Sequence, residues 1–430
     1  MIMSIKKILI PILFLTPLRA VFLFIMPFVN YMLSKYVIVS CKTRSFNLLL
    51  FLLIISSIIG YASGINNLLN ISVCLFLTIP VLYVFLSSVT GIYNEGCIIS
   101  FYKYSRLILI AVHIVGILYM AYIPASYRDD ALSYSYGDHF NKMNGLAIID
   151  ALFVFYYFTK YSNRTKGDIR VLINLIIWFA FFILCFFGLG LSCLIITFGI
   201  FFLLKFKISR TIPILFVSIL TIYTLPKFFP NNARYLDKNY NAVIEFNVEN
   251  NNADLRKLMM VYNYIKFVNE NPLHAIVGVG PGGFNSRTAF FLNCESKNIV
   301  VKTFGSTMPY FHKKYIYPLH NEDVVSFEMG SDGTRNRPFS SLIAFCAEFG
   351  LIFTIVFLVF WIRRIFSYYR IMKSDSRYLF LFLANIYFLL VFSVDQWFTT
   401  SEFVYFIFFT KIYETYIKSS EKNTLCKLPL

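Results

Sequence analysis

The sequence predicts an all-α polytopic membrane protein of about 11–12 transmembrane helices with one large external loop containing an amphipathic helix. Of its 430 residues, 58% are hydrophobic and 14% are charged, a composition outside the usual range of soluble domains. Continuous apolar runs of about 20 residues, long enough to cross a hydrocarbon core of roughly 30 Å, recur along the chain.

Eleven apolar blocks mark the expected membrane elements, at residues 8–34, 46–63, 68–90, 104–124, 144–158, 169–187, 189–206, 211–228, 339–361, 378–395 and 402–417. The first block holds three prolines and Arg19, which are costly in the middle of a single span. We therefore expect it to cross the membrane twice, which gives twelve elements and leaves both chain ends on one side.

Most loops between the blocks are either strongly basic or almost without basic charge, and the two kinds alternate. Much of the net charge of +17 sits in the basic loops, which the positive-inside rule places in the cytoplasm. This distribution explains the charge without nucleic-acid binding. It also divides the chain into three regions. Residues 1–228 form an N-terminal bundle of about eight or nine membrane elements with a short external loop at 125–143. Residues 229–338 form a large loop outside the cytoplasm, and residues 339–430 form C-terminal helices with a cytoplasmic tail.

The eight cysteines are scattered, with no C-x-x-C spacing and no histidine cluster. We therefore expect no zinc site and no disulfide framework. The sequence also gives no reason to expect a cofactor.

The large loop contains an amphipathic helix over 254–270. Its apolar residues fall on one face at helical spacing: Leu255, Leu258, Met259, Tyr262 and Ile265. Such a helix is suited to lie on a membrane surface with that face down. Asn271 and Pro272 are expected to end it.

A glycine-rich turn, GVGPGGF at 278–284, follows that helix. It neither joins a strand to a helix nor ends in Lys-Ser/Thr, so it is not a dinucleotide fingerprint or a P-loop. We favour a tight turn that needs positive φ angles over a phosphate cradle formed by the backbone of Gly280, Gly282 and Gly283, although the two are compatible.

Five external arginines are candidates for binding a diphosphate, because guanidinium groups bind phosphate oxygens bidentately. The alternative for each is a solvated charge or a contact with a phospholipid head group. They are Arg128, Arg256, Arg287, Arg335 and Arg337. His320 is the candidate general base, with a structural histidine as its alternative.

Three ionisable residues lie inside apolar blocks, and such groups normally face the bundle interior or a polar cavity. They are His113, Asp150 and Glu348. We expect Glu348 to fix helix packing through hydrogen bonds instead of touching substrate. Asp395 and Glu402, at the outer ends of the last two elements, are expected to be solvated.

The order of these motifs resembles the O-antigen polymerase and O-antigen ligase superfamily. The matching features are an external helix with Arg256, then NPLHAIVGVGPGGF at 271–284, a polar loop, and a helix reading SSLIAFCAEFGLIF at 340–353. The family's later helix carries an A-E-x-G-L segment, which residues 347–351 match, and DHFNKMNGLA at 138–147 resembles the family's N-x-L-A helix start.

Two departures from the family pattern refine this resemblance. Ligases usually have a His-Asn pair at the start of the later helix, where this chain reads RPFSS at 337–341, and this favours a polymerase. Many members have an arginine near the position of 188–192, where this chain has none, and its absence moves Arg128 up the list of candidates.

The resemblance implies a metal-independent glycosyltransferase that joins undecaprenyl-diphosphate-linked oligosaccharide repeat units at the periplasmic face of the bacterial inner (cytoplasmic) membrane. It also implies membrane lipid, a chain-length regulator and a flippase as partners. Arg256 and Arg128, with Arg337 next, would hold the diphosphate, Arg287 and Arg335 would contact substrate, and His320 would act on the acceptor hydroxyl.

Three alternatives stay open. One is an O-antigen ligase that transfers glycan to lipid A core. Another is a lipid-linked oligosaccharide flippase or other transporter, although transporters tend to carry internal repeats and the sequence has no evident one. The third is a structural subunit of a polysaccharide assembly.

Overall fold

The computed structural model describes residues 10–18, 28–34, 37–41, 43–92, 95–122, 136, 145–163, 169–185, 187–205, 256–293, 308–319 and 340–425. Within these ranges, five helices are long and apolar enough to cross a membrane: Arg44–Ala62, Leu68–Leu86, Ile98–Tyr119, Leu351–Met372 and Ser376–Val394. Two shorter apolar helices are Ile169–Leu184 and Gly188–Leu204. The prediction of an all-α membrane protein is confirmed. The total of 11–12 spans and the large external loop stay predictions, and the block at 211–228 lies outside the described residues.

The first half of the chain supplies most of the membrane bundle. Its described elements, in order, are α3 (Val29–Ser34), β1 (Val37–Cys41), α4 (Thr43–Ala62), α5 (Leu68–Leu86), β2 (Ser87–Ile92), α6 (Glu95–Tyr122), α8 (Gly145–Ser162), α9 (Ile169–Leu184) and α10 (Gly188–Lys205).

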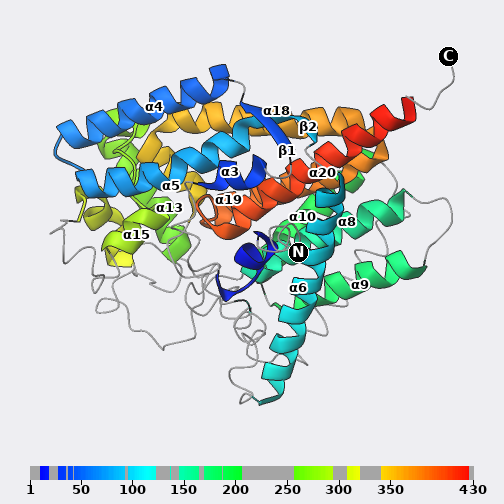
Figure 1. Cartoon of the computed structure of the whole chain (residues 1–430). Coiled ribbons are helices and arrows are strands. Elements are labelled where there is room, and N and C mark those ends of the chain that lie inside the picture. Colours follow the sequence, from blue (N-terminus) through cyan, green and yellow to red (C-terminus); the bar gives the residue numbers. More distant parts are fainter. Residues whose placement is uncertain are drawn as a thin grey trace.

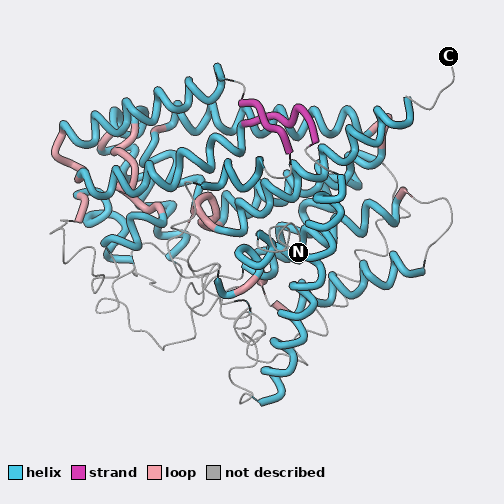
Figure 2. The backbone as a smooth tube through the Cα atoms, in the orientation of Figure 1, coloured by secondary structure: helices cyan, strands magenta, loops and turns pink. Residues whose placement is uncertain are grey.

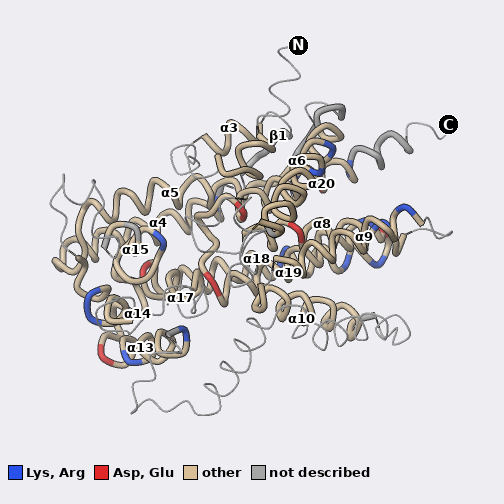
Figure 3. Tube along the Cα trace, turned by 90° about the horizontal axis from the view of Figure 1, so that it is seen from below, with Lys and Arg blue, Asp and Glu red and all other residues tan. Residues whose placement is uncertain are grey.

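The second half adds short helices around the glycine-rich turn and then three long helices. Its elements are α13 (Arg256–Glu270), α14 (Pro272–Val277), α15 (Arg287–Asn293), η7 (His312–Ile316), η8 (Tyr317–Leu319), α17 (Ser341–Ala344), η10 (Phe345–Phe349), α18 (Leu351–Met372), η11 (Ser376–Tyr378), α19 (Leu379–Val394) and α20 (Ser401–Leu425). Helices α13 and α15 lie at one end of the molecule, and α8 and α9 lie at the opposite end (Figures 1 and 3).

The core is built around α19. In the window covering this helix, 72% of residues are buried, against 22–50% in the other four spans. Phe388 of α19 stacks on Phe406 of α20 with ring centroids 3.9 Å apart, and Trp361 of α18 donates a hydrogen bond to Asn385 Oδ1 at 3.1 Å. Aromatic packing and polar contacts such as this one therefore join the three C-terminal helices.

A short antiparallel pair, β1 and β2, interrupts the helical architecture (Figure 2). The sequence analysis assigns the first strand to a basic loop and the second to the end of a membrane block, so both assignments are wrong here. Helix α5 ends at Leu86, and pairing with β1 satisfies backbone groups that the helix no longer satisfies. The strands read VIVSC and SSVTGI, and their β-branched residues suit this conformation.

The expected single helix over 339–361 is broken at Gly350. Its N-terminal part is α17 followed by the π-helical turn η10, and α18 begins only at Leu351 and continues to Met372. Gly350 has φ of 91°, and a Cβ atom on it would lie 2.3 Å from the Ile276 carbonyl oxygen. Close contact with α14 therefore causes the break. Because α18 runs past 361, Arg363 and Arg364 lie on the helix instead of in a loop.

Candidate functional site

The glycine-rich turn packs directly on the broken helix. The Val279 N–H donates to the Ala347 carbonyl at 2.9 Å, and the Gly280 N–H donates to the Glu348 carbonyl at 3.1 Å. Two segments about 70 residues apart in the sequence thus share backbone hydrogen bonds. These segments contain two of the motifs that carry the family resemblance, at 278–284 and 347–351.

The Glu348 carboxylate completes this contact. Its Oε2 accepts from the Gly282 N–H at 2.6 Å, and its Oε1 accepts from the N–H groups of Phe284 at 3.0 Å and Ser286 at 2.7 Å. The side chain is 0% exposed. Alternate N–H groups of the turn converge on one point and form an anion-binding concavity, and the anion in it is the chain's own carboxylate.

Glycine is required in this contact for space as well as for backbone conformation. Gly278, Gly280 and Gly282 have φ of 94°, 91° and 73°. A Cβ on Gly278 would also lie 2.3 Å from the Glu348 carbonyl oxygen. In α4, a Cβ on Gly60 would lie 2.3 Å from the Val279 carbonyl oxygen, so this helical glycine is needed for close approach alone.

Helices α4 and α5 hold the other side of the turn. Ser56 Oγ donates to the Glu348 carbonyl at 2.5 Å, Asn66 Nδ2 donates to the Pro281 carbonyl at 3.0 Å, and Asn70 Nδ2 donates to the Gly282 carbonyl at 2.8 Å. The sequence analysis does not identify these residues or Gly60. A usable signal was present, because Ser56 and Gly60 form a small-xxx-small pair in an apolar helix.

Helix α13 is fixed over the ends of the membrane helices. Met260 and Phe267 are buried, and Lys257 Nζ donates to the Val394 carbonyl at 2.7 Å and lies 3.6 Å from Asp395 Oδ2. Arg256 is the first residue of α13, next to Lys257. This arrangement joins the start of α13 to the end of α19.

The opposite face of α13 is exposed and apolar. Leu258, Tyr262 and Ile265, which the sequence analysis assigns to a membrane-facing side, are 38%, 42% and 53% exposed. The face that packs on the protein is therefore a different one.

Two acidic residues expected to be solvated are buried. Asp395 is 0% exposed and Glu402 is 2% exposed, so that expectation is wrong. Asp395 contacts Lys257 as described above, and Glu402 Oε1 accepts a hydrogen bond from the Tyr136 hydroxyl at 3.3 Å. Both carboxylates lie where helix ends are covered by other segments of the chain.

The segment 308–319 packs against the turn. His312 is fully buried, and its Nδ1–H donates to the Phe284 carbonyl. Burial lowers the pKa of His312 to about 4. On the surface, Lys314 Nζ donates to Glu270 Oε2 at 2.7 Å, and this hydrogen bond lowers the pKa of Glu270.

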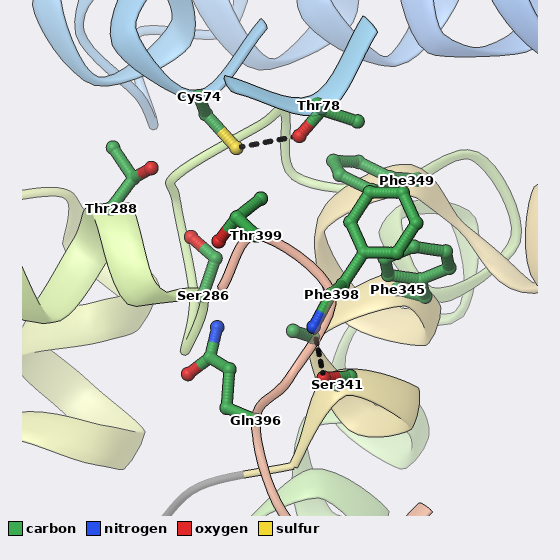
Figure 4. Close-up of a pocket in the computed structure, with 11 residues that line it drawn as sticks. Cys74, Thr78, Ser286, Thr288, Ser341, Phe345, Phe349, Gln396, Phe398 and Thr399 are labelled. Carbon is green, nitrogen blue, oxygen red and sulfur yellow. Dashed lines mark hydrogen bonds between the residues drawn. The ribbon is translucent and has the colours of Figure 1, made fainter. Parts of the chain in front are cut away.

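A small cavity lined by both polar and aromatic side chains lies beside the turn (Figure 4). Its volume of about 20 Å³ has room for ordered water but is too small for a sugar ring. Gln396 Oε1 is buried without a hydrogen-bond partner among the described residues, and water there would satisfy it. The polar residues around the cavity are Cys74, Thr78, Ser286, Thr288, Ser341, Gln396 and Thr399.

The structure places some of the sequence-derived candidates at this site. Arg287 is the first residue of α15, directly before Thr288 at the cavity. The N–H groups of Gly280 and Gly282 bind Glu348, and the Gly283 N–H donates to the Gly280 carbonyl at 3.1 Å, so all three are engaged within the protein. The side chain of Arg256 is not described. The remaining candidates lie outside the described residues: Arg128, His320, Arg335 and Arg337.

Gly60→Ala is predicted to separate α4 from the turn. The added methyl group meets backbone atoms of Val279 and Gly280, which cannot rotate away, and overpacking of this kind costs about 1–3 kcal/mol. We expect a lower thermal unfolding temperature in detergent. Gly199→Ala, in membrane helix α10, is the matched control because nothing lies within 4 Å of its added Cβ. Equal unfolding temperatures for the two variants would contradict the close contact.

Glu348→Gln is predicted to weaken the turn. An amide keeps the shape of the side chain but places an NH₂ group against at least one backbone N–H donor. Loss of a charge-assisted bond at a buried site costs about 1.5–3 kcal/mol. We expect faster proteolysis of 256–319 and a lower unfolding temperature. Glu270→Gln, at an exposed carboxylate, is expected to cause a smaller change, and the reverse order would be evidence against the role of Glu348.

Acid is predicted to destabilise the fold through the buried, neutral ring of His312. Its folded-state pKa of about 4 lies below the ordinary value of 6.5, so the unfolded chain binds the proton more readily. Stability present near pH 7 is therefore lost as the pH falls from about 6.5 to 4. His312→Asn keeps a donor near the Nδ1 position without titrating. The difference in unfolding temperature between wild type and this variant should shrink on acidification; a constant difference would count against the assignment.

No family model, curated protein or solved structure matches this chain, so its function has to be argued from its own residues.

Proposed function

We propose that this chain is an O-antigen polymerase, which joins undecaprenyl-diphosphate-linked oligosaccharide repeat units at the periplasmic face of a bacterial inner membrane. The observation that carries the proposal is the contact between the glycine-rich turn and Glu348. The two motifs behind the family resemblance, at 278–284 and 347–351, hydrogen-bond to each other through backbone and side chain.

A lipid-diphosphate substrate needs cations at the depth of the membrane interface. The turn and the contacts of Lys257 with α19 hold the start of α13 at the end of a membrane helix. Arg256 stands at that start, where the helix dipole also favours an anion. These features support Arg256 as a ligand of the diphosphate.

The exposed apolar face of α13 supports the same location. Leu258, Tyr262 and Ile265 are exposed on a helix whose other side packs on the protein. In a membrane, such a face is covered by acyl chains near the head groups. The diphosphate of a lipid-linked glycan lies at that level, with its polyprenyl tail in the hydrocarbon.

The proposed reaction is a glycosyl transfer. The hydroxyl of the acceptor sugar attacks the anomeric carbon of the growing glycan, a new C–O bond forms, and the bond from that carbon to the lipid diphosphate breaks. A general base, for which His320 is the candidate, takes the hydroxyl proton. Negative charge develops on the departing diphosphate, and positioned arginines stabilise it in the transition state. Arg256 is the first of these and Arg128 the second.

Arg256→Ala is predicted to abolish long surface polysaccharide. The variant is expressed in the native host, its amount in the membrane is measured, and the polysaccharide is separated on a gel. Loss of one transition-state cation costs roughly 10²–10³ in rate, so we expect the ladder of long chains to collapse to single-repeat material.

Lys266→Ala is the matched control, because this lysine lies on the same helix, is 53% exposed and pairs with Glu270 at 3.9 Å. It should leave the ladder intact. An unchanged ladder in the Arg256 variant would reject this residue as a clamp. Loss of all capped lipid, single repeats included, would point to a ligase instead of a polymerase.

A further inference from the structure

Three buried side chains converge far along the chain from the glycine-rich turn. His113 comes from α6, Asp150 from α8, and Cys185 directly follows α9. His113 Nε2 lies 2.9 Å from Asp150 Oδ2, and Cys185 Sγ lies 3.5 Å from the same oxygen. All three ligand atoms lie within 4.8 Å of one another, and the residues are 0%, 0% and 2% exposed.

The histidine is held with one ring nitrogen turned to the other two groups. Its Nδ1 lies 2.7 Å from the Leu109 carbonyl oxygen, and a carbonyl only accepts, so Nδ1 carries the proton. The ring stacks on Phe181 with centroids 4.0 Å apart. A backbone carbonyl on Nδ1 that leaves Nε2 as a ligand is the usual arrangement of a metal-binding histidine.

This arrangement leaves two electron-rich atoms facing each other. With the proton on Nδ1, the lone pair of Nε2 points at a carboxylate oxygen 2.9 Å away, and a positive species is needed between them. That species is either a second proton or a metal ion.

The second carboxylate oxygen of Asp150 indicates that a metal ion explains the arrangement better than a proton does. Asp150 Oδ1 is buried and has no hydrogen-bond partner among the described residues. A proton between Nε2 and Oδ2 leaves this oxygen unsatisfied in an apolar interior, which is costly. A metal ion can bind both carboxylate oxygens, and it also accounts for the nearby thiol.

We propose that His113, Asp150 and Cys185 bind a zinc ion that ties α6, α8 and α9 together. Nitrogen, oxygen and sulfur donors together suit zinc. Bonds of about 2.0–2.3 Å to zinc place ligand atoms roughly 3.3–3.8 Å apart. The Asp150–Cys185 distance of 3.5 Å already fits, and the His113–Asp150 distance of 2.9 Å has to widen slightly. His113 Nε2 and Cys185 Sγ, which lie within 4.8 Å of each other, have to approach by at most about 1 Å. The second carboxylate oxygen or a water molecule completes the tetrahedron. The site is structural, and it does not depend on the proposed glycosyl transfer.

The first test is the metal content of the full chain purified in detergent without chelators. We expect about one zinc ion per chain, and a large loss in Asp150→Asn and Cys185→Ser. Cys193→Ser is the matched control, because Cys193 is a buried cysteine of the neighbouring helix α10 that is not one of the three proposed ligands. The protein with this substitution should retain about one zinc ion per chain. Zinc well below one per chain that does not rise on addition, or equal content in every variant, overturns the proposal.

A second measurement needs no variant and therefore does not depend on whether substituted chains fold. Wild-type membranes are treated with a thiol-reactive maleimide before and after a strong chelator, and labelling is mapped by peptide. The thiol of Cys185 should become reactive only after chelation, while labelling of Cys193 should not change. If the labelling of Cys185 is the same before and after chelation, a proton is the bridging species between His113 and Asp150, and the zinc proposal is rejected.

Discussion

A carboxylate buried among membrane helices is unstable unless hydrogen-bond donors surround it, and Glu348 finds three donors on one turn. The N–H groups of Gly282, Phe284 and Ser286 converge on its two oxygens. The glycine-rich turn also depends on the carboxylate, because these three N–H groups would otherwise lack a hydrogen-bond acceptor. The carboxylate and the turn therefore satisfy each other's hydrogen-bonding groups, and the surrounding architecture keeps the two in contact.

Several irregular features become understandable from this one contact. The helix breaks at Gly350 because α14 lies against it, and Gly60 has no side chain because the turn lies against α4. Ser56, Asn66 and Asn70 supply side-chain donors to carbonyl groups of the turn and of Glu348. Irregular backbone at membrane depth is tolerated when other parts of the protein satisfy its polar groups. Through these bonds the segment containing α13 is attached to two N-terminal membrane helices as well as to the C-terminal ones.

The parts of this architecture that depend on composition were predictable from the sequence. Helix boundaries such as those of α5, α9 and α19 follow the apolar blocks within a few residues, because the cost of exposing polar backbone in lipid fixes where helices must be. The hydrophobic pattern did not reveal the break at Gly350, because an apolar run looks the same whether its backbone is continuous or kinked. It also missed the strands β1 and β2, whose pairing joins segments about 50 residues apart.

Contacts between side chains that are far apart in the sequence are harder to predict, for a related reason. The sequence identifies His113 and Asp150 as ionisable groups inside membrane blocks. Periodicity predicts which way each residue faces, but it does not predict which other residue it contacts. Cys185 is one more scattered cysteine in the sequence. Metal-binding patterns are recognised by short spacings, and the proposed ligands come from α6, α8 and the residue after α9. In the same way, the sequence predicts that Glu348 forms hydrogen bonds in helix packing. It does not identify the three donors from the turn, because they are backbone N–H groups, which every residue except proline has.

Evolution constrains a bond between a side chain and the main chain differently from a bond between two side chains. A side chain that binds another side chain can change together with its partner, and relatives then reveal the pair as two positions that vary jointly. The three bonds from the turn to the Glu348 carboxylate all come from main-chain N–H groups, which no substitution can exchange. Among relatives of this chain, the contact would leave a fixed acidic position and a fixed spacing of glycines, each for its own physical reason, and methods that infer contacts from joint variation would find nothing between them.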